Sequence, residues 1–246
     1  MIKKHLPKVI LRLIPVFLKK WGTKQFPRLK WIGSHRVFCI SLQKTGTTSV
    51  GDFFIHFGFP TARWIHSWQN QWTRKWFEGD FESIFSSKEF KRRQVFEDDP
   101  WWCPEFYKVL YHRFPKAKFV LFYRDSEQWF QSMMKHHGGK NLGNARQHCK
   151  MYRREKEFYD RLENDPQFAP SPYEVELLMD MEPHKQHYTD LYKVRQKEVL
   201  EFFDQKDNSR LISLQLEDPD KWVKLGKFMG LKVPKDLDIH SNASKT

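Results

Sequence analysis

Arg36-Val-Phe-Cys-Ile-Ser-Leu42, followed directly by Gln43-Lys-Thr-Gly-Thr-Thr-Ser49, is the stretch that decides the fold. Its first half is a short apolar run rich in strand-forming side chains, and its second half is a turn rich in Gly and Thr. Residues 49–57 then carry apolar side chains at helical spacing, which predicts a helix that ends at Gly58. A strand, a tight turn and a helix in direct succession are typical of the beginning of an α/β domain.

The same alternation continues along the rest of the chain. The clearest strand is the apolar run 118–123, and the helix predicted after it begins near Ser126. A last helix is expected to have Asp218 as its cap and Pro219 at its first position, and to end at Gly230. Continuous apolar strands separated by helices predict an α/β protein, a three-layer fold with a central parallel sheet flanked by helices. The further predicted elements are strands at 94–97 and 210–216 and helices at 104–114, 145–162 and 188–203.

Length and composition exclude several classes of protein. The 246 residues suit one large domain, and a content of 39% hydrophobic and 16% aromatic residues is too high for a disordered chain. No apolar run reaches the about eighteen residues of a conventional membrane span. Cys39, Cys103 and Cys149 are widely spaced and lack a CxxC motif, so neither a disulfide framework nor a zinc site is indicated, and a reducing compartment is expected.

The positive charge of the chain is concentrated near its N-terminus. Lys and Arg number 43 against 30 Asp and Glu, a formal net charge of +13, yet the first acidic residue is Asp52. Eleven Lys and Arg precede Asp52, so the rest of the chain is nearly neutral. This distribution argues against a uniformly basic surface, and no nucleic-acid partner is expected.

Residues 1–30 form a basic segment without any acidic residue. Apolar side chains recur at helical spacing with Lys and Arg between them, as in a helix on an anionic membrane surface, although Pro15 should kink or end this helix. A helix packed on the rest of the protein and a short organellar transit segment are the alternatives, whereas Arg12 interrupts the apolar region that a signal peptide needs. We therefore divide the chain into a basic amphipathic segment, 1–30, and a single α/β domain, 31–246.

The turn at residues 43–49 has the composition of a phosphate-binding loop, with an ordinary strand–helix turn as the alternative. In a parallel sheet, ligands bind beyond the carboxyl ends of the strands, where this turn is expected. Gly46 permits close approach of the backbone, and N–H groups at the start of the next helix can hold a phosphate. The loop is not a Walker A motif, because Lys44 precedes the glycine. The candidate phosphate-binding residues are Lys44, Thr45, Gly46, Thr47, Thr48 and Ser49.

Lys44-Thr-Gly-Thr-Thr-Ser49 resembles the 5′-phosphosulfate loop of the sulfotransferases that use 3′-phosphoadenosine 5′-phosphosulfate (PAPS). That family pairs the loop with an arginine at the end of a later strand and a serine eight residues further on, which contact the 3′-phosphate. Here Arg124 follows the strand at 118–123, and Ser132 lies eight residues later. Arg124 taken alone has the alternative interpretation of a surface salt bridge.

A third similarity lies near the C-terminus, where residues 210–230 resemble the family's closing strand and helix. Matching features thus extend from about Arg36 to Pro234. The resemblance implies a P-loop-type sulfotransferase fold for the domain 31–246.

The resemblance also implies a reaction, in which a sulfuryl group moves from PAPS to a hydroxyl or amine of an acceptor and 3′-phosphoadenosine 5′-phosphate (PAP) is released. Lys44 would neutralise the charge that builds on the bridging oxygen, while residues 45–49 would hold the 5′-phosphate. Arg124 and Ser132 would contact the 3′-phosphate. No metal is expected, because the sequence shows no Walker B-like acidic partner for Mg²⁺ and the family does not need one.

The acceptor must lose a proton, so a general base is expected near the sulfuryl group. In cytosolic members of the family the base is a histidine at the end of the strand before the arginine strand, and here that strand ends in Asp98-Asp99-Pro100. Repulsion between adjacent carboxylates raises the pKa of one, which favours Asp99 as the base and Asp98 as second choice. Either carboxylate could instead cap the next helix. His66 is the rival base, for which packing between tryptophans is the alternative.

The sequence departs from the two best-known groups of this family. It lacks the Arg-Lys-Gly element of the cytosolic aryl and steroid type after Leu216, and it lacks the transmembrane anchor of the Golgi carbohydrate type. It therefore looks more like the compact sulfotransferases, and its acceptor, a small molecule or a carbohydrate, is not specified. Five tryptophans are candidates for binding the acceptor, although they could instead belong to the hydrophobic core: Trp64, Trp68, Trp72, Trp101 and Trp102. His136, His137 and Lys140 are candidates for binding an anionic acceptor, with a solvated loop as the alternative.

Two other functions stay open on the sequence alone. A P-loop nucleotide kinase or another phosphotransferase would use a similar loop, but the position of Lys44 disfavours it. A non-catalytic module that binds PAP or PAPS and attaches to a membrane through residues 1–30 is the other alternative. For the sulfotransferase we expect a cytoplasmic location, with peripheral membrane contact through residues 1–30.

Overall fold

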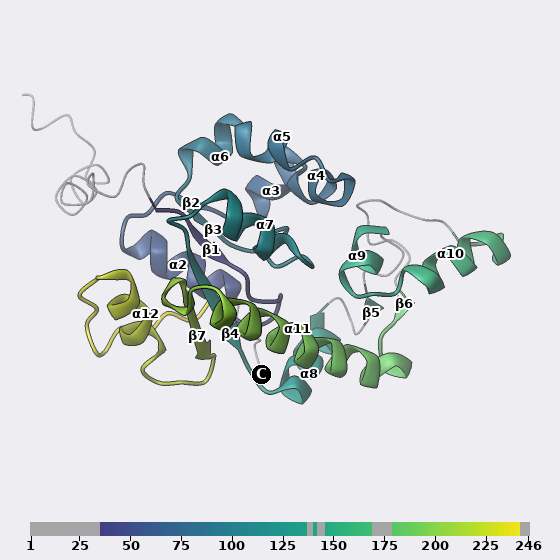
Figure 1. The fold of residues 1–246 in the computed structure, drawn as a ribbon. Coiled ribbons are helices and arrows are strands. Elements are labelled where there is room, and N and C mark those ends of the chain that lie inside the picture. The colour runs from purple at the N-terminus through teal and green to yellow at the C-terminus, as the bar shows by residue number, and fades with distance from the viewer. Residues whose placement is uncertain (1–34, 137–139, 142–145, 169–178, 242–246) are drawn as a thin grey trace, which may run out of the picture.

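A computed structural model of the protein describes residues 35–136, 140–141, 146–168 and 179–241. Its centre is a five-stranded sheet in the order β2-β3-β1-β4-β7, in which all neighbouring strands are parallel (Figure 1). A separate pair, β5 (Lys140–Asn141) and β6 (Met179–Asp180), is antiparallel. The predicted parallel sheet is confirmed. Its strands are β1 (Val37–Cys39), β2 (Thr61–Ala62), β3 (Val95–Phe96), β4 (Lys118–Tyr123) and β7 (Leu211–Gln215).

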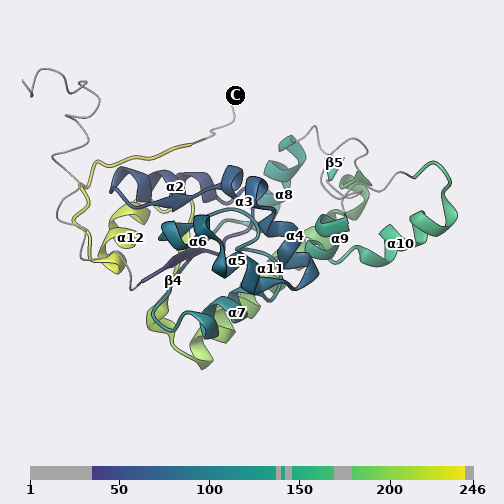
Figure 2. The same ribbon diagram turned by 90° about the horizontal axis from the view of Figure 1, so that it is seen from above.

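Successive side chains of each strand point to opposite faces of the sheet. Because these side chains are apolar on both faces, helices cover both faces and bury them. Val37 and Cys39 point to one face, where they pack with α2 (Thr47–His56) and α12 (Lys221–Met229). Phe38 points to the other face, so the sheet is the middle of three layers (Figure 2). The predicted three-layer α/β architecture is confirmed. The helices of the second face are α4 (Trp72–Glu78), α5 (Phe81–Ser86), α6 (Lys88–Arg92), α7 (Phe106–Arg113), α8 (Ser126–Lys135) and α11 (Lys185–Gln205).

The region between β2 and β3 holds helices that the sequence patterns do not predict. Here α3 (Trp64–Asn70) is followed by α4, α5 and α6, each five to seven residues long. Elements this short give no clear 3.6-residue periodicity. The charged stretch at 145–162 likewise differs from its prediction as one helix. It forms α9 (Arg146–Met151) and α10 (Glu155–Asn164), and Arg153 between them has a left-handed φ of 54°.

The last helix begins later than predicted. It starts at Lys221 with Asp220 as its N-cap residue, so the prediction that Asp218 caps the helix and Pro219 opens it is wrong. The Asp218 carboxylate instead accepts the backbone N–H of Asp220 at 2.9 Å and forms the turn before the helix. The predicted end at Gly230 is confirmed, where φ is 69°.

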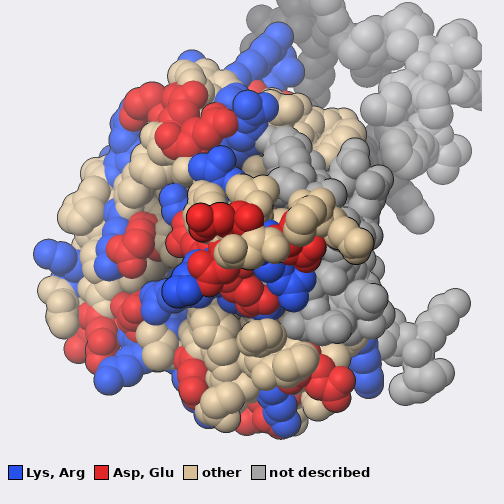
Figure 3. Space-filling view, turned by 90° about the vertical axis from the view of Figure 1, so that its right-hand side faces the viewer, with Lys and Arg blue, Asp and Glu red and all other residues tan. Residues whose placement is uncertain are grey.

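Two sequence predictions lie outside the described residues. One is the amphipathic segment 1–30, so its separation from the domain 31–246 stays a prediction. The other is most of the loop at 136–140. In the described part of the chain, no helix is long and apolar enough to cross a membrane. On the face that carries α10, Lys and Arg are interspersed with Asp and Glu (Figure 3).

Candidate active site

Three chain segments meet at the carboxyl edge of the sheet because β1 lies between β3 and β4. Phe38 of β1 is in register with Phe96 of β3 and with Phe119 of β4. Since these strands are parallel, the loop after β1 lies between the carboxylates that follow β3 and the arginine that follows β4. Neighbouring strands are about 4.8 Å apart, so the carboxylate turn and the arginine begin about 10 Å apart with the loop between them.

The loop after β1 is shaped by two residues with a left-handed backbone. Lys44 has a φ of 66° and Gly46 a φ of 84°. A Cβ atom at Gly46 would lie 2.6 Å from Leu216 Cδ1, so only glycine suits both the backbone angle and the available space. Gly46 is the N-cap residue of α2 and offers no side-chain cap. The first N–H groups of the helix can therefore bind an anion.

The loop hydroxyls differ in what they can still bind. Thr45 is fully buried, and its hydroxyl donates to a main-chain carbonyl three residues earlier. That proton is engaged in the turn, so Thr45 can contribute to anion binding through its backbone N–H. The buried Ser49 accepts the backbone N–H of Ser241 at 3.0 Å, which ties the C-terminal tail to α2. Thr47 is also buried, whereas Thr48 is half-buried.

Lys44 lies close enough to Arg124 to feel its charge. Burial, and the positive charge of Arg124, lower the pKa of Lys44. Arg124 Nη2 lies 3.2 Å from Glu217 Oε1, and the Arg124 backbone N–H donates to the Tyr192 hydroxyl at 2.9 Å. The Arg124 Nε is buried and has no partner among the described residues. An anion between the two cations would relieve their repulsion and satisfy the buried donor.

Ser132 lies in the second turn of α8, the helix that begins two residues after Arg124. Asp125 caps this helix by accepting two of its first N–H groups. Trp129 of the same helix donates its indole N–H to the carbonyl of Gln43 at 2.9 Å. The half-buried Ser132 is thus carried by a helix that is fixed both to the arginine and to the phosphate loop.

Asp98 and Asp99 form a tight turn directly after β3. Asp98 has a left-handed φ of 72°, and its Oδ1 accepts the backbone N–H of Asp99 at 2.9 Å. Asp99 Oδ2 accepts the hydroxyl of Thr73, whereas Asp99 Oδ1 is buried without a partner among the described residues. The N-cap residue of α7 is Glu105, so neither aspartate caps the next helix.

The two aspartates are harder to ionise than ordinary carboxylates. Burial, and then the charge of Asp98, raise the pKa of Asp99 to about 7. Burial also raises the pKa of Asp98. Repulsion between the two carboxylates, the cause expected from the sequence, is thus the smaller cause, and desolvation is the larger one.

Tyr152 joins the phosphate loop to the carboxylate turn. The side-chain amide of Gln43 donates to the Tyr152 hydroxyl, and the Tyr152 ring centroid lies 6.2 Å from that of Trp102. Burial raises the pKa of the Tyr152 hydroxyl, and the charge of Asp98 adds to this shift. The loop and the carboxylate turn therefore share a buried neighbour.

Comparison with known protein families identifies the family to which the chain belongs. A family model described as a sulfotransferase domain matches residues 36–245. The chain belongs to the sulfotransferase domain family. The protein is therefore a transferase whose activity class is sulfuryl transfer to an acceptor. No curated protein matches the chain.

Glu97 is a buried carboxyl group of this sulfotransferase that the sequence analysis does not single out. Only 2% of the residue is exposed, and burial, followed by the charge of Asp98, raises the pKa of Glu97 to about 8. Its Oε1 accepts Arg63 Nε at 3.2 Å, and its Oε2 has no partner among the described residues. A Cβ atom at Gly51 of α2 would lie 3.0 Å from Glu97 Cγ, so the acid is enclosed between β3 and α2.

His66, the alternative base considered from the sequence, makes contacts that cap the start of a helix of the sulfotransferase. Its Nδ1 accepts the backbone N–H of Arg63 at 3.0 Å, which caps the start of α3. Its Nε2 lies 3.8 Å from Glu89 Oε1. Burial, and the charge of Arg93, lower the pKa of His66. These contacts direct the imidazole toward α6, whereas Asp99 accepts a hydrogen bond from Thr73 of α4.

The five tryptophans expected near the acceptor do not form one cluster. Trp72, Trp101 and Trp102 are buried in the core of the second face, so they do not line an open pocket. Trp64 and Trp68 are 53% and 60% exposed, and their rings stack with centroids 6.3 Å apart and planes 23° apart. The sulfotransferase therefore presents two of the five aromatic side chains to solvent. Among the described residues, no group of three or more His, Cys, Asp or Glu side chains is arranged to hold a metal ion.

Proposed function

We propose that this sulfotransferase uses PAPS as its donor, transfers the sulfuryl group to a hydroxyl or amine of a small-molecule acceptor, and releases PAP. The observation that carries the proposal is the buried Nε of Arg124, which has no partner among the described residues, in an arginine close enough for its charge to act on Lys44. A nucleotide with phosphate groups at both the 3′ and the 5′ position of one ribose would supply negative charge to both cations.

The residues present fit such a donor. The backbone N–H groups at the start of α2, Lys44 and the Thr48 hydroxyl would hold the 5′-phosphosulfate. Arg124 and Ser132 would hold the 3′-phosphate, and the phosphate would replace Glu217 as the partner of the guanidinium. Glu217 is 40% exposed, so its carboxylate can return to water when it is displaced.

The chemistry requires one charge to be neutralised and one proton to be removed. When bound, PAPS supplies the sulfuryl group and a phosphate leaving group. Lys44 stabilises the charge that develops on the oxygen between phosphorus and sulfur. The ionised Asp99 would accept the acceptor's proton at Oδ1, the oxygen without a partner among the described residues, while Thr73 holds Oδ2 in place. A pKa of about 7 suits a group that must be ionised before the reaction and protonated after it.

The exposed pair Trp64 and Trp68 supports an acceptor that carries a ring. Arg63, just before α3, bonds Glu97, the neighbour of the aspartates, at 3.2 Å. In the middle of α3, the Ser67 and Thr73 hydroxyls are 3.3 Å apart, and Thr73 bonds Asp99. The start and the middle of α3 are thus connected to the carboxylate turn, which brings the helix that carries the stacked indoles near the proposed base and would offer an aromatic surface to the acceptor.

Titration calorimetry with PAP tests the donor. We expect the wild-type protein to bind PAP, and Arg124→Ala to weaken binding roughly 10- to 100-fold because a charge-assisted contact is lost. Arg161→Ala, on α10, is the matched control: among the described residues Arg161 pairs with Glu157, at 3.7 Å, and the variant should leave PAP affinity unchanged. Tight binding of Mg·ATP without binding of PAP would instead favour a phosphotransferase.

Steady-state kinetics with a ring-bearing acceptor test the aromatic surface. Replacing Trp64 and Trp68 together by alanine should raise the acceptor KM roughly tenfold, because two stacking contacts are lost, and should leave PAP affinity unchanged. Tyr159→Ala removes an exposed aromatic ring of α10 and serves as the control. An unchanged KM in the double variant would remove these indoles from the acceptor site without affecting the donor assignment.

A further inference from the structure

A cavity of about 400 Å³ lies at the amino edge of the sheet. Four of the residues that line it directly precede a strand: Arg36 precedes β1, Pro60 precedes β2, Gln94 precedes β3 and Ala117 precedes β4. The candidate active site follows the same strands, so the six-residue length of β4, about 20 Å, separates the two. The cavity is large enough for a small polar ligand.

The lining of this cavity is basic. Six of its described lining residues are Lys or Arg, and none of them is acidic. Arg93 is paired with Glu89 at 2.5 Å, and Arg113 with Glu82 at 3.2 Å. The other four cations have no carboxylate partner among the described residues, so they give the cavity a positive potential. They are Arg36, Lys91, Arg92 and Lys116.

Arg36 is the most informative of these four cations because it is half-buried. Its Nη1 donates to the carbonyls of Phe90 at 3.2 Å and of Arg93 at 2.9 Å, and its guanidinium lies 4.3 Å from the Phe90 ring centroid. Burial lowers the pKa of Arg36. Carbonyls and aromatic rings orient the guanidinium but do not neutralise it. The described hydrogen bonds of its side chain use Nη1 alone, which leaves Nε–H and Nη2–H as donors.

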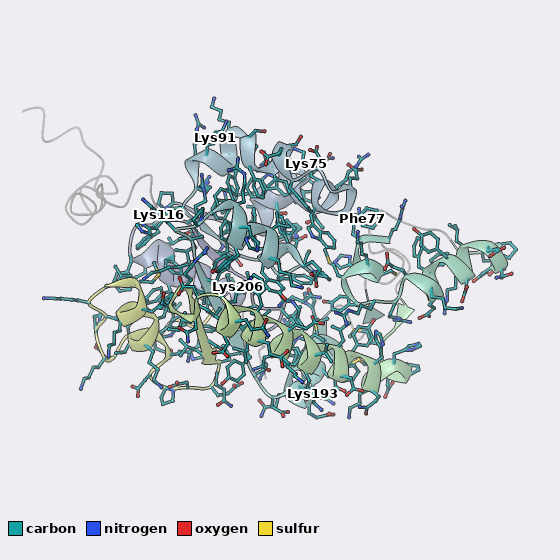
Figure 4. All side chains as sticks on the ribbon, viewed as in Figure 1. Lys75, Phe77, Lys91, Lys116, Lys193 and Lys206 are labelled. Atoms are coloured by element: carbon teal, nitrogen blue, oxygen red, sulfur yellow. The ribbon has the colours of Figure 1, made fainter. Side chains whose placement is uncertain are left out.

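The sequence that leads into the cavity is also basic. Nine Lys and Arg residues and no acidic residue precede His35, and His35 itself lines the cavity. Lys91 and Lys116 lie toward the end of the molecule where the described chain begins, whereas Lys193 lies on α11, away from that end (Figure 4). The basic sequence of the N-terminus therefore joins the domain at the basic cavity.

We propose that this cavity is a second anion site, which binds a phosphomonoester group independently of the proposed sulfuryl transfer. Arg36 would bind the phosphate oxygens from the floor, and Lys91, Arg92 and Lys116 would add charge from the rim. The phosphomonoester can belong to a phosphoinositide headgroup or to a soluble phosphate ester. In the first case, the basic residues before His35 would add electrostatic attraction to the same membrane.

Binding measurements on the full-length chain at physiological salt test this site. The probes are a soluble inositol trisphosphate and phosphatidylcholine vesicles with and without phosphatidylinositol bisphosphate. The variant Lys91→Gln with Lys116→Gln should weaken binding by about tenfold or more, since each cation near an anionic surface contributes about 1 kcal/mol. Lys193→Gln with Lys197→Gln removes the same charge from the middle of α11, away from the amino edge, and should leave binding unchanged. All four lysines are exposed, so both variants should unfold at the wild-type temperature.

The two probes separate the sources of the phosphate. Binding of both probes, or of either one, that weakens in the cavity variant and not in the control supports the site, and the probe that binds identifies the source. Equal binding by both variants and wild type, or no binding of either probe, overturns it. PAP affinity measured on the same variants should equal that of wild type, so failure of the second site and failure of the donor assignment give different results.

Discussion

The two edges of the central sheet both carry positive charge, but in different surroundings. At the carboxyl edge, Arg124 lies across the Lys44 loop from a turn of three carboxyl groups, and burial shifts the pKa of Lys44, Asp99 and Glu97. At the amino edge, Arg36 and its neighbours surround a cavity whose described lining residues include no Asp or Glu. Opposite charges with shifted pKa values are typical of a catalytic site, whereas cations alone suit the binding of an anion. The net charge of +13 does not distinguish the two edges, whereas the positions of the charged residues along the sheet do.

The largest expected difference between the two edges is catalytic, and Lys44→Ala tests it. Turnover should fall about 10³-fold, because the charge that develops on the leaving oxygen loses its partner. PAP affinity should fall much less, since the backbone N–H groups of α2 remain. Lys116→Ala at the amino edge is the control and should keep wild-type turnover. Equal turnover of the two variants would contradict the distinction between the edges.

Asp99→Asn should lower turnover about 100-fold and leave PAP affinity nearly unchanged, because the amide cannot accept a proton. The pKa of Asp99 is raised to about 7, and the base acts in its ionised form. The wild-type rate at low acceptor concentration should therefore rise between about pH 6 and pH 8 and then level off. The variant should lose this rise. Wild-type turnover in Asp99→Asn would exclude this residue as the base and direct attention to Asp98.

Glu97 predicts a pH dependence of stability rather than of rate. Its pKa of about 8 in the folded protein lies above the ordinary value, so the folded state binds the proton more tightly than the unfolded state. Its contribution to stability is fully present below about pH 4.5 and is lost as the pH rises toward 8. Between pH 5 and pH 7, the free energy of unfolding of wild type should fall by roughly 2 kcal/mol relative to Glu97→Gln. Parallel pH profiles in urea denaturation would show that Glu97 is not buried as described.

The smallest expected effect compares two glycines with nearly the same backbone. Gly46 and Gly79 have φ values of 84° and 77°, but only Gly46 has a neighbour, Leu216, in the space of a Cβ atom. Gly79→Ala should cost about 1 kcal/mol of stability, the strain of the left-handed backbone. Gly46→Ala should cost about 1 kcal/mol more and should also weaken PAP binding. Combining Gly46→Ala with Leu216→Ala should recover part of the loss in thermal unfolding, and no recovery would exclude the contact as its cause.

Elements defined by continuous apolar runs could be predicted from the sequence. The strand predicted at 118–123 has those bounds as β4, because six apolar or amphipathic side chains are followed by a charged pair. The helix after the phosphate loop begins at Thr47, two residues before its prediction, because Gly46 turns the chain into the helix at once. The short helices between β2 and β3 could not be predicted, since their positions depend on contacts with distant residues and not on local periodicity.

The candidate site likewise contains residues that the sequence predicted and residues that it did not. The spacing of the two motifs led to Lys44 and Arg124, and the structure brings them within electrostatic reach. Glu97 escaped notice because its burial depends on Arg63 and Gly51, which are distant in sequence. The sequence did not show which tryptophans are buried and which are exposed, because tryptophan occurs both in protein cores and on exposed surfaces. Residue type and spacing thus predict a candidate anion site, whereas desolvation can be seen only once the chain is folded.

Transfer of label from ³⁵S-PAPS into a panel of phenolic, alcoholic and amine acceptors tests whether the protein is a PAPS-dependent sulfotransferase. We expect label in at least one acceptor with wild-type protein, about 10³-fold less with Lys44→Ala, and no loss with Lys116→Ala. PAP should be released in equal amount to the labelled product. PAP binding without label in any acceptor above the rate of free PAPS hydrolysis would contradict sulfuryl transfer and favour a module that binds the nucleotide without catalysis.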